Sequence, residues 1–305
     1  MKILIIGMGS IAQKHIQAIR SIEPEAEIFA LRHSKNGKDI NGIKSIYIWD
    51  DITFQPDFIL ISNPTSEHAI TIEKAIEFNC PLFIEKPSLH TLEKADELLK
   101  QIQERHIITY VGCDLRFHPA LNFIKSYLEK NKPIINEVNI YCGSFLQEWR
   151  SGVDYKKVYS SIPEFGGGVH LDLIHEPDYC YWIFGKPLQH KNLCRSKSSL
   201  EIKAIDYANM IFDYPSFTAS IILNYYRRDM KRMMEIVTDE ITISVDLITG
   251  KVYDNKQNIL FQSSVNSTDI YIHQMQHFID CIKNKKESMN SFEESIDVLK
   301  LCIKS

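Results

Sequence analysis

Glycine is scarce in this chain. It accounts for 12 of the 305 residues, whereas average usage of about 7% would give about 21. Because glycine allows backbone conformations and close approaches that other residues do not, it is placed where those properties are needed. The glycines that do cluster, Gly7 with Gly9 and the run at 166–168, therefore direct attention to two short segments.

Several other features are absent, and each absence excludes a class of protein. No apolar run reaches the roughly 18 residues of a membrane-spanning helix, and the first apolar stretch is too short for a signal peptide. The formal net charge of -4 and the pI near 6.3 show no excess of basic residues of the kind that binds nucleic acid. We therefore expect neither a membrane nor a nucleic acid as partner.

The seven cysteines are not spaced as metal ligands. They stand at 80, 113, 142, 180, 194, 281 and 302. Several lie in apolar surroundings, where cysteine is usually a small buried hydrophobic residue. We predict no metal site, and we expect the protein to work in a reducing cytoplasm.

The length of the chain and the order of its apolar runs predict two domains. Up to about residue 115, strand-like and helix-like segments alternate, which is typical of a doubly wound parallel sheet. The expected strands are 2–6, 26–31, 46–48, 57–62, 81–85 and 107–112, and the expected helices are 10–22, 66–79 and 91–105. Residues 1–116 are therefore predicted to form an N-terminal α/β domain of the Rossmann type.

In the remainder of the chain, strands follow one another without helices between them, which implies a largely antiparallel sheet. The expected strands are 135–142, 188–195, 204–212, 217–225, 232–238 and 241–247, and the expected helices are 119–130, 168–184, 269–283 and 292–303. Residues 117–305 are predicted to form a C-terminal α+β domain with an open sheet.

The first glycine cluster has the spacing of a dinucleotide-binding fingerprint. Gly7 permits a tight turn, Gly9 leaves room for a pyrophosphate, and Ala12 lets the next helix pack closely. The N-terminus of that helix offers N–H groups and a positive dipole end to phosphates. The alternative is an ordinary strand–turn–helix. We predict cofactor contacts from Gly7, Gly9, Ser10, Ile11 and Ala12.

The residues after the second predicted strand favour NADP(H) over NAD(H). An acidic residue is expected there when the ribose 2′-hydroxyl of NAD is bound. This chain has Arg32-His33-Ser34-Lys35 instead, and Arg32 and Ser34 can bind a 2′-phosphate through charge-assisted hydrogen bonds. The alternative is a solvated basic turn.

Two further segments are expected on the same rim, because ligands bind beyond the carboxyl ends of parallel strands. One follows the fourth predicted strand, and its Thr65 is also a candidate N-cap for the next helix. The other closes the fifth strand, and its Lys86 is a candidate proton-handling group. The predicted cofactor contacts are Asn63, Pro64, Thr65, His68, Glu85 and Lys86, with His68 expected to be structural rather than catalytic.

The second glycine cluster leads into a candidate acid–base group. Asp172 and His175 are three residues apart, which puts them on one face of a helix. In such a pair the carboxylate orients the imidazole ring and the ring moves the proton. Glu176 shares that face and competes for the role, whereas His170 points elsewhere. The alternative is a histidine that caps the helix or is satisfied in the core.

In order and spacing, these segments resemble the glucose–fructose oxidoreductase / inositol dehydrogenase / MocA (Gfo/Idh/MocA) family. The resemblance rests on Gly7-x-Gly9-x-x-Ala12, Asn63-Pro64-Thr65-x-x-His68, Glu85-Lys86-Pro87 and the run 166–176. It implies a Rossmann domain and an α/β domain whose open sheet often forms the subunit interface, hence a homodimer or homotetramer. It also implies that Lys86 contacts the reacting hydroxyl or carbonyl, and that Asp172 and His175 complete the acid–base set.

The chain departs from many family members, which place the histidine four residues after the aspartate, at the position of Glu176 here. The arrangement resembles a branch often seen among surface-glycan genes. This second resemblance implies substrate-pocket residues that can hold an anion through paired donors or stack on a sugar. They are Arg116, His118, Trp149, Arg150, Tyr155 and Asp172. The alternative is that these segments only cover the open sheet.

The function predicted from these motifs and the resemblance is an NAD(P)-dependent dehydrogenase or reductase. It would act on the CH–OH group of a sugar or nucleotide sugar, in the biosynthesis of a surface glycan. His175 or Lys86 would take or return the hydroxyl proton while hydride is transferred. Two alternatives stay open: an NAD-dependent glycosidase with no net redox change, and a nonenzymatic NADP(H) sensor.

Overall fold

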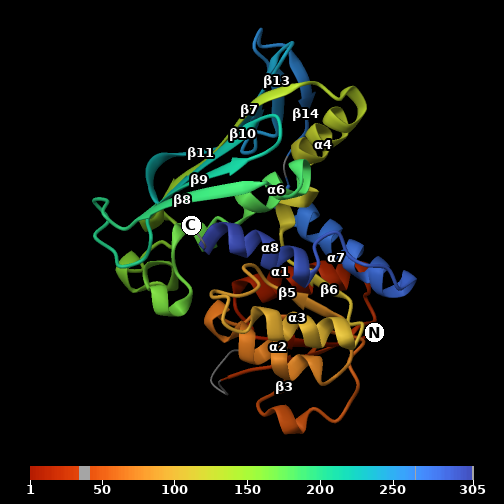
Figure 1. Ribbon diagram of the computed structural model, residues 1–305. Helices are drawn as coiled ribbons and strands as arrows, with labels where there is room; N and C mark the ends of the chain where they lie inside the picture. Colours follow the sequence, from red (N-terminus) through yellow and green to blue (C-terminus); the bar gives the residue numbers. More distant parts are fainter. Residues whose placement is uncertain (34–41, 265, 304–305) are drawn as a thin grey trace. The chain divides into compact units, whose positions relative to one another are not determined.

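The computed structural model describes residues 1–33, 42–264 and 266–303, and its chain divides into two compact units (Figure 1). Unit 1 comprises Met1–Cys113 and Ser267–Asp297, and unit 2 comprises Asp114–Asn266 and Val298–Ser305. Among the helices of the described ranges, none combines the length and the apolar character needed to cross a bilayer. No disulfide joins any of the seven cysteines, all of which fall in those ranges.

Unit 1 contains a six-stranded parallel sheet in the order β3-β2-β1-β4-β5-β6, which confirms the predicted Rossmann architecture. Its central strands are apolar on both faces, because helices cover both sides: all four residues of β4 are buried. The strands are β1 (Lys2–Ile6), β2 (Glu27–Leu31), β3 (Ile43–Ile46), β4 (Phe58–Ile61), β5 (Leu82–Ile84) and β6 (Thr109–Val111).

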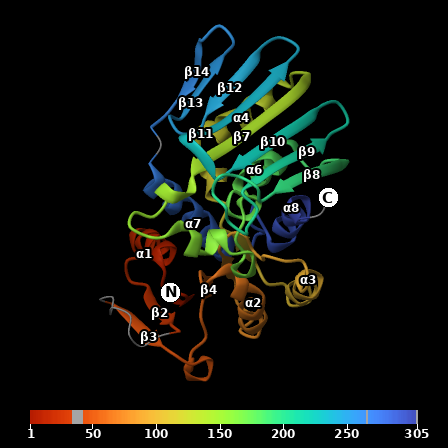
Figure 2. The same ribbon diagram turned by 90° about the vertical axis from the view of Figure 1, so that its left-hand side faces the viewer.

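The helices of unit 1 form two layers around this sheet. Figure 2 shows α2 and α3 on one side and α1 with α7 on the other. Their bounds are α1 (Ser10–Ile22), α2 (His68–Ile76), α3 (Ala95–Glu104) and α7 (Ser267–Asn284).

Helix α7 belongs to unit 1 although it comes late in the chain. The ring of Phe278 lies edge-on to Phe58 and Phe83, at centroid distances of 5.3 and 5.5 Å, and all three side chains are fully buried. The observed units therefore differ from the predicted segments 1–116 and 117–305 in this returning helix. The physical reason is that the apolar face of α7 completes the core beneath a parallel sheet, which periodicity alone does not reveal.

Unit 2 contains an eight-stranded sheet in the order β14-β13-β12-β11-β7-β10-β9-β8. The β7–β10 pair is parallel and the other neighbouring pairs are antiparallel, which confirms the predicted, largely antiparallel sheet. The strands are β7 (Ile135–Phe145), β8 (Gln189–Arg195), β9 (Tyr207–Asp213), β10 (Thr218–Asn224), β11 (Tyr226–Thr238), β12 (Thr242–Asp246), β13 (Lys251–Asp254) and β14 (Ile259–Gln262).

One face of this sheet is packed and the other is open. Figure 2 shows α4 (Pro119–Asn131) and α6 (His175–Phe184) behind the strands. Along β9, Met210 and Phe212 are fully buried, whereas the side chain between them, Ile211, is 42% exposed. This alternation is the period-two pattern of a strand with one buried face.

The predicted helix 168–184 is two helices. Helix α5 (Val169–Asp172) ends at Asp172, Leu173 leaves the helical region with φ -100° and ψ 36°, and α6 begins at His175. The predicted helix 66–79 is also shorter, since α2 begins at His68. Thr65 lies in a 3-10 turn and its side chain makes no capping hydrogen bond, so its predicted N-cap role is wrong.

Candidate functional site

The fingerprint turn of unit 1 has the backbone that a dinucleotide site requires. Gly7 has φ +87°, and a Cβ there would stand 2.6 Å from the backbone nitrogen of Asn63, so only glycine fits. Beside Gly9 the space is open. The N-terminus of α1 has neither a side-chain cap nor an acidic residue in its first turn. Its N–H groups can therefore serve a phosphate.

A hollow of about 540 Å³ in unit 1 adjoins this turn. The predicted cofactor residues that line it are Gly7, Arg32, Asn63 and Pro64. Met8, His33, Tyr47, Trp49, Glu67 and Thr71 complete its wall together with Ile6 and Leu31. An uncapped helix end beside a cavity with aromatic and basic walls fits the phosphates and the adenosine of a dinucleotide.

Arg32 is held at the wall of the hollow by the neighbouring strand. Its Nη1 donates to Ser45 Oγ at 3.2 Å, and its backbone N–H donates to Ile46 at 2.8 Å. Ser34, which was predicted beside it, lies outside the described residues. Ser10 and Ile11 lie in the first turn of α1, and Ala12 is fully buried as its packing role requires.

His68 connects two loops of unit 1. Its Nε2 lies 3.1 Å from the carbonyl oxygen of Asn63, and its Nδ1 lies 3.1 Å from those of Pro87 and Ser88. The side chain is 1% exposed, and burial lowers its pKa. His68 is therefore structural, as expected, and its predicted contact with the cofactor is replaced by these internal contacts.

Glu85 also turns inward. Its Oε1 lies 2.5 Å from Nε2 of His15 on α1, and its Oε2 accepts the backbone N–H of Lys86 at 3.2 Å. His15 is fully buried and lies edge-on to Phe83. The predicted role of Glu85 in binding the cofactor is therefore replaced by a brace between the fingerprint helix and the loop of Lys86, whose peptide bond to Pro87 is cis.

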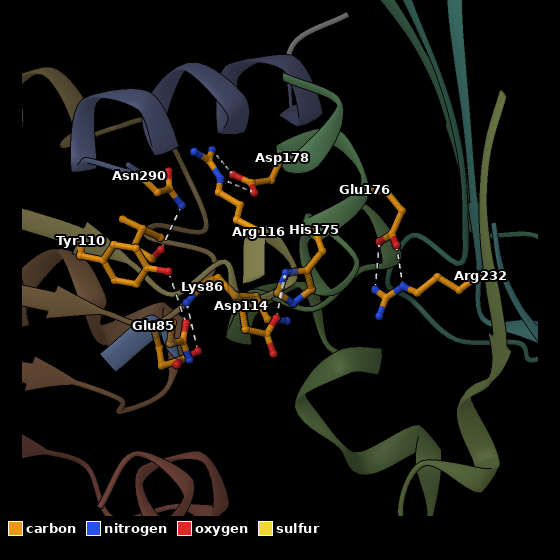
Figure 3. Close-up of polar contacts among 12 residues, drawn as sticks. Glu85, Lys86, Tyr110, Asp114, Arg116, His175, Glu176, Asp178, Arg232 and Asn290 are labelled. Atoms are coloured by element: carbon orange, nitrogen blue, oxygen red, sulfur yellow. Dashed lines mark hydrogen bonds and ion pairs between the residues drawn. The ribbon is translucent and has the colours of Figure 1, made fainter. Parts of the chain in front are cut away.

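In unit 2, His175 meets a carboxylate that sequence spacing did not suggest. Its Nδ1 is 3.5 Å from Oδ1 of Asp114, at the start of the 3-10 turn η3 (Asp114–Phe117). The two side chains are only 11% and 19% exposed. Because electrostatic interactions are stronger where water is excluded, this is an acid–base geometry in a favourable setting (Figure 3).

Two ion pairs hold the first turn of α6 around His175 (Figure 3). Arg116 donates from Nε and Nη2 to the carboxylate of Asp178 at 2.9 and 2.7 Å. Arg232 donates to Glu176 at 2.7 and 3.2 Å. Although burial opposes the charge, the Glu176 carboxylate holds the pKa of Arg232 above its ordinary value. Both pairs are bidentate, which fixes orientation as well as distance.

Asp172 is bound by tyrosine hydroxyls in unit 2. The hydroxyl of Tyr225 donates to its Oδ2 at 2.5 Å. Burial and the Asp172 carboxylate both raise the pKa values of Tyr225 and Tyr159. The tyrosines therefore remain neutral donors. The predicted pairing of Asp172 with His175 on one helix fails because the helix is broken between them.

Arg116 and His118 have internal partners in unit 2. Arg116 is fully buried and its guanidinium is paired with Asp178. His118 caps α4 by accepting the N–H of Ala120 at 3.2 Å, and its other ring nitrogen donates to Leu247 at 3.1 Å. Burial lowers the pKa of His118 to about 4. Internal partners therefore use polar atoms that a ligand would need, and substrate binding by these two residues stays a prediction.

The other predicted substrate residues do come together. Trp149, Arg150 and Tyr155 line one small hollow of unit 2. The indole of Trp149 donates to Ser144 Oγ at 2.9 Å and lies edge-on to Tyr225. The guanidinium of Arg150 lies over the ring of Tyr159 at 5.4 Å. These contacts connect the loop to the tyrosines around Asp172.

The triple glycine explains how this loop reaches α5. A Cβ on Gly167 would stand 2.2 Å from the carbonyl oxygen of Tyr159, so the two backbones touch. His170 follows, with a half-buried side chain whose pKa is lowered by desolvation to about 4, which makes it a poor candidate for proton exchange with a substrate.

Sequence reasoning missed Asp114, Arg232, Tyr225 and His15. Asp114 follows β6 after two intervening residues. Side chains just beyond strand ends often form ligand sites in such sheets, and that signal was available. Arg232 on β11 and Tyr225 between β10 and β11 come from far along the chain, and nothing local marks them. His15 lies on the buried face of α1 and resembles an ordinary core residue in sequence.

Comparisons with known proteins agree with the geometry. Residues 1–113 match the GFO_IDH_MocA family, an oxidoreductase family with an NAD-binding Rossmann fold. The chain is 21% identical over 307 residues to scyllo-inositol 2-dehydrogenase (NAD(+)) of Bacillus subtilis, covering 92% of this chain and 86% of that protein. It is 24% identical over 193 residues to 2,7-anhydro-N-acetylneuraminate hydratase of Mediterraneibacter gnavus, covering 59% of this chain and 48% of that one.

Among solved structures, the WlbA dehydrogenase from Bordetella pertussis, in complex with NADH and UDP-GlcNAcA, has the same fold. Its TM-score is 0.84 at 16% identity, with 99% of this chain and 93% of that chain covered. The fingerprint turn, the sheet order and the family match agree: residues 1–113 carry the NAD-binding Rossmann fold of the Gfo/Idh/MocA oxidoreductase family.

Proposed function

We propose that this protein is an NAD(P)-dependent dehydrogenase or reductase acting on a CH–OH group of a sugar or nucleotide sugar. The observation that carries this proposal is the fingerprint turn, whose uncapped helix α1 opens beside the hollow of unit 1. Supporting it, each unit contributes a candidate proton-handling side chain, Lys86 in unit 1 and His175 in unit 2.

The proposed chemistry divides the work among residues of the chain. When bound, the nicotinamide accepts or supplies a hydride. His175 takes the hydroxyl proton during oxidation and returns it during reduction. Lys86 stabilises the developing alkoxide. The N-terminus of α1 and Gly9 bind the pyrophosphate, and Trp149, Arg150 and Tyr155 bind the substrate.

The proposed cofactor preference is NADP(H), and the support is Arg32. Its guanidinium lies at the wall of the hollow, steadied by Ser45, and it can pair with a 2′-phosphate that NAD lacks. A substrate of the surface-glycan class is supported by a structural neighbour whose complex contains UDP-GlcNAcA.

A screen of nucleotide sugars and sugar acids with NAD(H) and NADP(H) tests the function. At least one substrate should change the absorbance band of reduced nicotinamide in step with product. Lys86→Ala should lower kcat by several powers of ten, on the order of proton transfer and alkoxide stabilisation combined, with little change in cofactor affinity. If Lys86→Ala keeps near-normal turnover on that substrate, the proposed mechanism is wrong.

A second candidate is a reaction with no net redox change, such as a glycosidase that oxidises and re-reduces its substrate. The observation that favours it is the relative named as a hydratase, since hydration adds water and leaves the oxidation level unchanged overall. In the same screen, product detected by mass spectrometry with no net change in the nicotinamide band identifies this reaction. A nonenzymatic NADP(H) sensor would bind cofactor and turn over nothing.

A homodimer or homotetramer formed through unit 2 is the proposed assembly. Its support is the open face of the eight-stranded sheet, where Leu193 and Ile211 are 47% and 42% exposed on the adjacent strands β8 and β9. Apolar side chains gathered on one face of a sheet are typical of an interaction surface.

A further inference from the structure

Three carboxylates lie within three residues of His175, and each has a partner elsewhere in unit 2. Asp172 accepts from Tyr225, Glu176 from Arg232, and Asp178 from Arg116. The carboxylate at ion-pair distance from the His175 ring is that of Asp114. The acidic residues next to His175 in sequence therefore fix the helix that carries it. The carboxylate near its ring comes from a separate element, the turn η3.

The turn that carries Asp114 is fixed against α6. Asp114 and Arg116 belong to the same 3-10 turn η3, and the bidentate pair of Arg116 with Asp178 is fully buried at 0% and 2% side-chain exposure. A buried, two-pronged pair has little freedom to rotate. Because Asp178 follows His175 by one helical turn, this pair sets the position of Asp114 relative to the imidazole (Figure 3).

We propose that Asp114 is a positioning residue for His175: its carboxylate, at an ion-pair distance of 3.5 Å from Nδ1, favours the tautomer that is protonated at Nδ1 and stabilises the imidazolium formed when Nε2 takes the substrate proton. This inference rests on the proposed function of His175. The step balances, since the hydroxyl proton moves to Nε2 and returns from it, while Asp114 stays a carboxylate throughout.

The charges around His175 determine how the Asp114 carboxylate affects its protonation. His175 is the first residue of α6, and the positive end of a helix disfavours a cation there. Glu176 and Asp178 lie on the same helix, Asp172 ends α5, Arg116 lies on η3 and Arg232 on β11. The two arginines are already neutralised by Glu176 and Asp178. Asp114 therefore supplies the charge that raises the proton affinity of His175.

The test is an NMR titration of His175 in the full chain, which needs no substrate. The ring ¹³Cε1 and ¹⁵N resonances of histidine-labelled protein report pKa and tautomer directly, and His175→Asn identifies the signals. The proteins compared are the wild type, Asp114→Asn, Asp114→Glu as the conservative rescue, and Asp213→Asn. Asp213 is an exposed carboxylate on β9 of the same unit, so its substitution controls for a general change of charge.

Asp114→Asn should lower the titration midpoint of His175 by about one pH unit or more, because an opposite charge nearby favours the imidazolium. It should also reduce the fraction protonated at Nδ1. Asp114→Glu should recover part of the shift, and Asp213→Asn should leave both signals unchanged. An unchanged midpoint and tautomer in Asp114→Asn would overturn the inference.

Activity separates this inference from the proposed function. If His175→Asn is inactive while Asp114→Asn has wild-type kcat and an unshifted pH profile, Asp114 is excluded and the role of His175 stands. If His175→Asn is fully active, the proposed function of His175 fails, whatever the titration shows. When both proposals hold, Asp114→Asn should lose at least about tenfold in kcat, a part of the roughly 10²–10⁴ that acid–base catalysis supplies, with KM little changed.

Discussion

Arg32 is the residue on which the proposed preference for NADP(H) rests. It replaces the acidic side chain expected for NAD, and its guanidinium is anchored to Ser45 at the wall of the hollow. Arg32→Asp should weaken NADP(H) binding by about ten- to a hundredfold, the scale of a hydrogen bond to a charged group, and should change NAD(H) binding much less. Isothermal titration with both cofactors measures the difference. Equal losses of affinity for NADP(H) and NAD(H) would show that Arg32 does not bind the 2′-phosphate.

Glu176 and His175 are neighbours with different tasks. Glu176 is fully buried and paired with Arg232. In Glu176→Gln the Arg232 guanidinium keeps one acceptor oxygen but loses the negative charge that balances its own. Its free energy of unfolding should fall on the order of 3 kcal/mol, while the folded enzyme keeps most of its kcat. His175→Asn should instead lose most of its kcat while its free energy of unfolding changes little.

Urea unfolding and steady-state kinetics on both variants separate the two effects. A stable, inactive Glu176→Gln enzyme together with an active His175→Asn enzyme would assign proton transfer to the carboxylate.

At the scale of elements, the pairing of η3 with α6 depends on Arg116 and Asp178. Asp178→Asn should cost about 3–5 kcal/mol of unfolding free energy, because it strands a buried charge. The double variant Arg116→Met with Asp178→Leu should recover much of that loss, since apolar side chains of similar size can replace a buried pair. Chemical denaturation of the single and double variants completes the cycle. If Asp178→Asn instead raised KM for the substrate at unchanged stability, Arg116 would be a substrate ligand after all.

Two histidines of unit 2 with lowered pKa values should make stability depend on pH. Burial lowers the pKa values of His118 and His170 to about 4 from an ordinary 6.5. Between about pH 6.5 and pH 4, these two histidines are therefore protonated in the unfolded chain and neutral in the folded chain. The free energy of unfolding should fall as pH drops through this range, because the unfolded state binds more protons.

Urea midpoints across this range measure the slope. His170→Gln should flatten it, whereas His273→Gln, at an exposed position on α7, should leave it unchanged. A slope that is the same in all three proteins would show that other groups cause it.

At the scale of the whole molecule, the open face of unit 2 is the proposed basis of assembly. Leu193→Lys combined with Ile211→Lys places two charges on adjacent strands β8 and β9, which an apolar interface does not accommodate. Light scattering should report a smaller particle than the wild type. Ile70→Lys is the matched control, because Ile70 is 58% exposed on α2 of unit 1. An oligomer that survives the double substitution would locate the interface elsewhere.

The sequence by itself determined the features that depend on neighbouring residues. The turn at Gly7 and Gly9, the helix after it and the parallel order of the strands are all visible locally, because a tight turn and a doubly buried strand leave short-range signals. The succession of strands without helices between them likewise indicated a largely antiparallel sheet in the second part of the chain. These signals were enough for the fold class and for the family.

Only the tertiary structure decided which polar groups meet. The three-residue spacing of Asp172 and His175 predicted a shared helical face, but the chain leaves the helix at Leu173 and Asp172 turns to Tyr225. The carboxylate facing His175 comes from η3 instead. Ion pairs such as that of Arg116 join elements far apart in the chain, and the strength of a buried pair depends on desolvation and geometry. The desolvation and the geometry of such a pair are set only when the chain has folded.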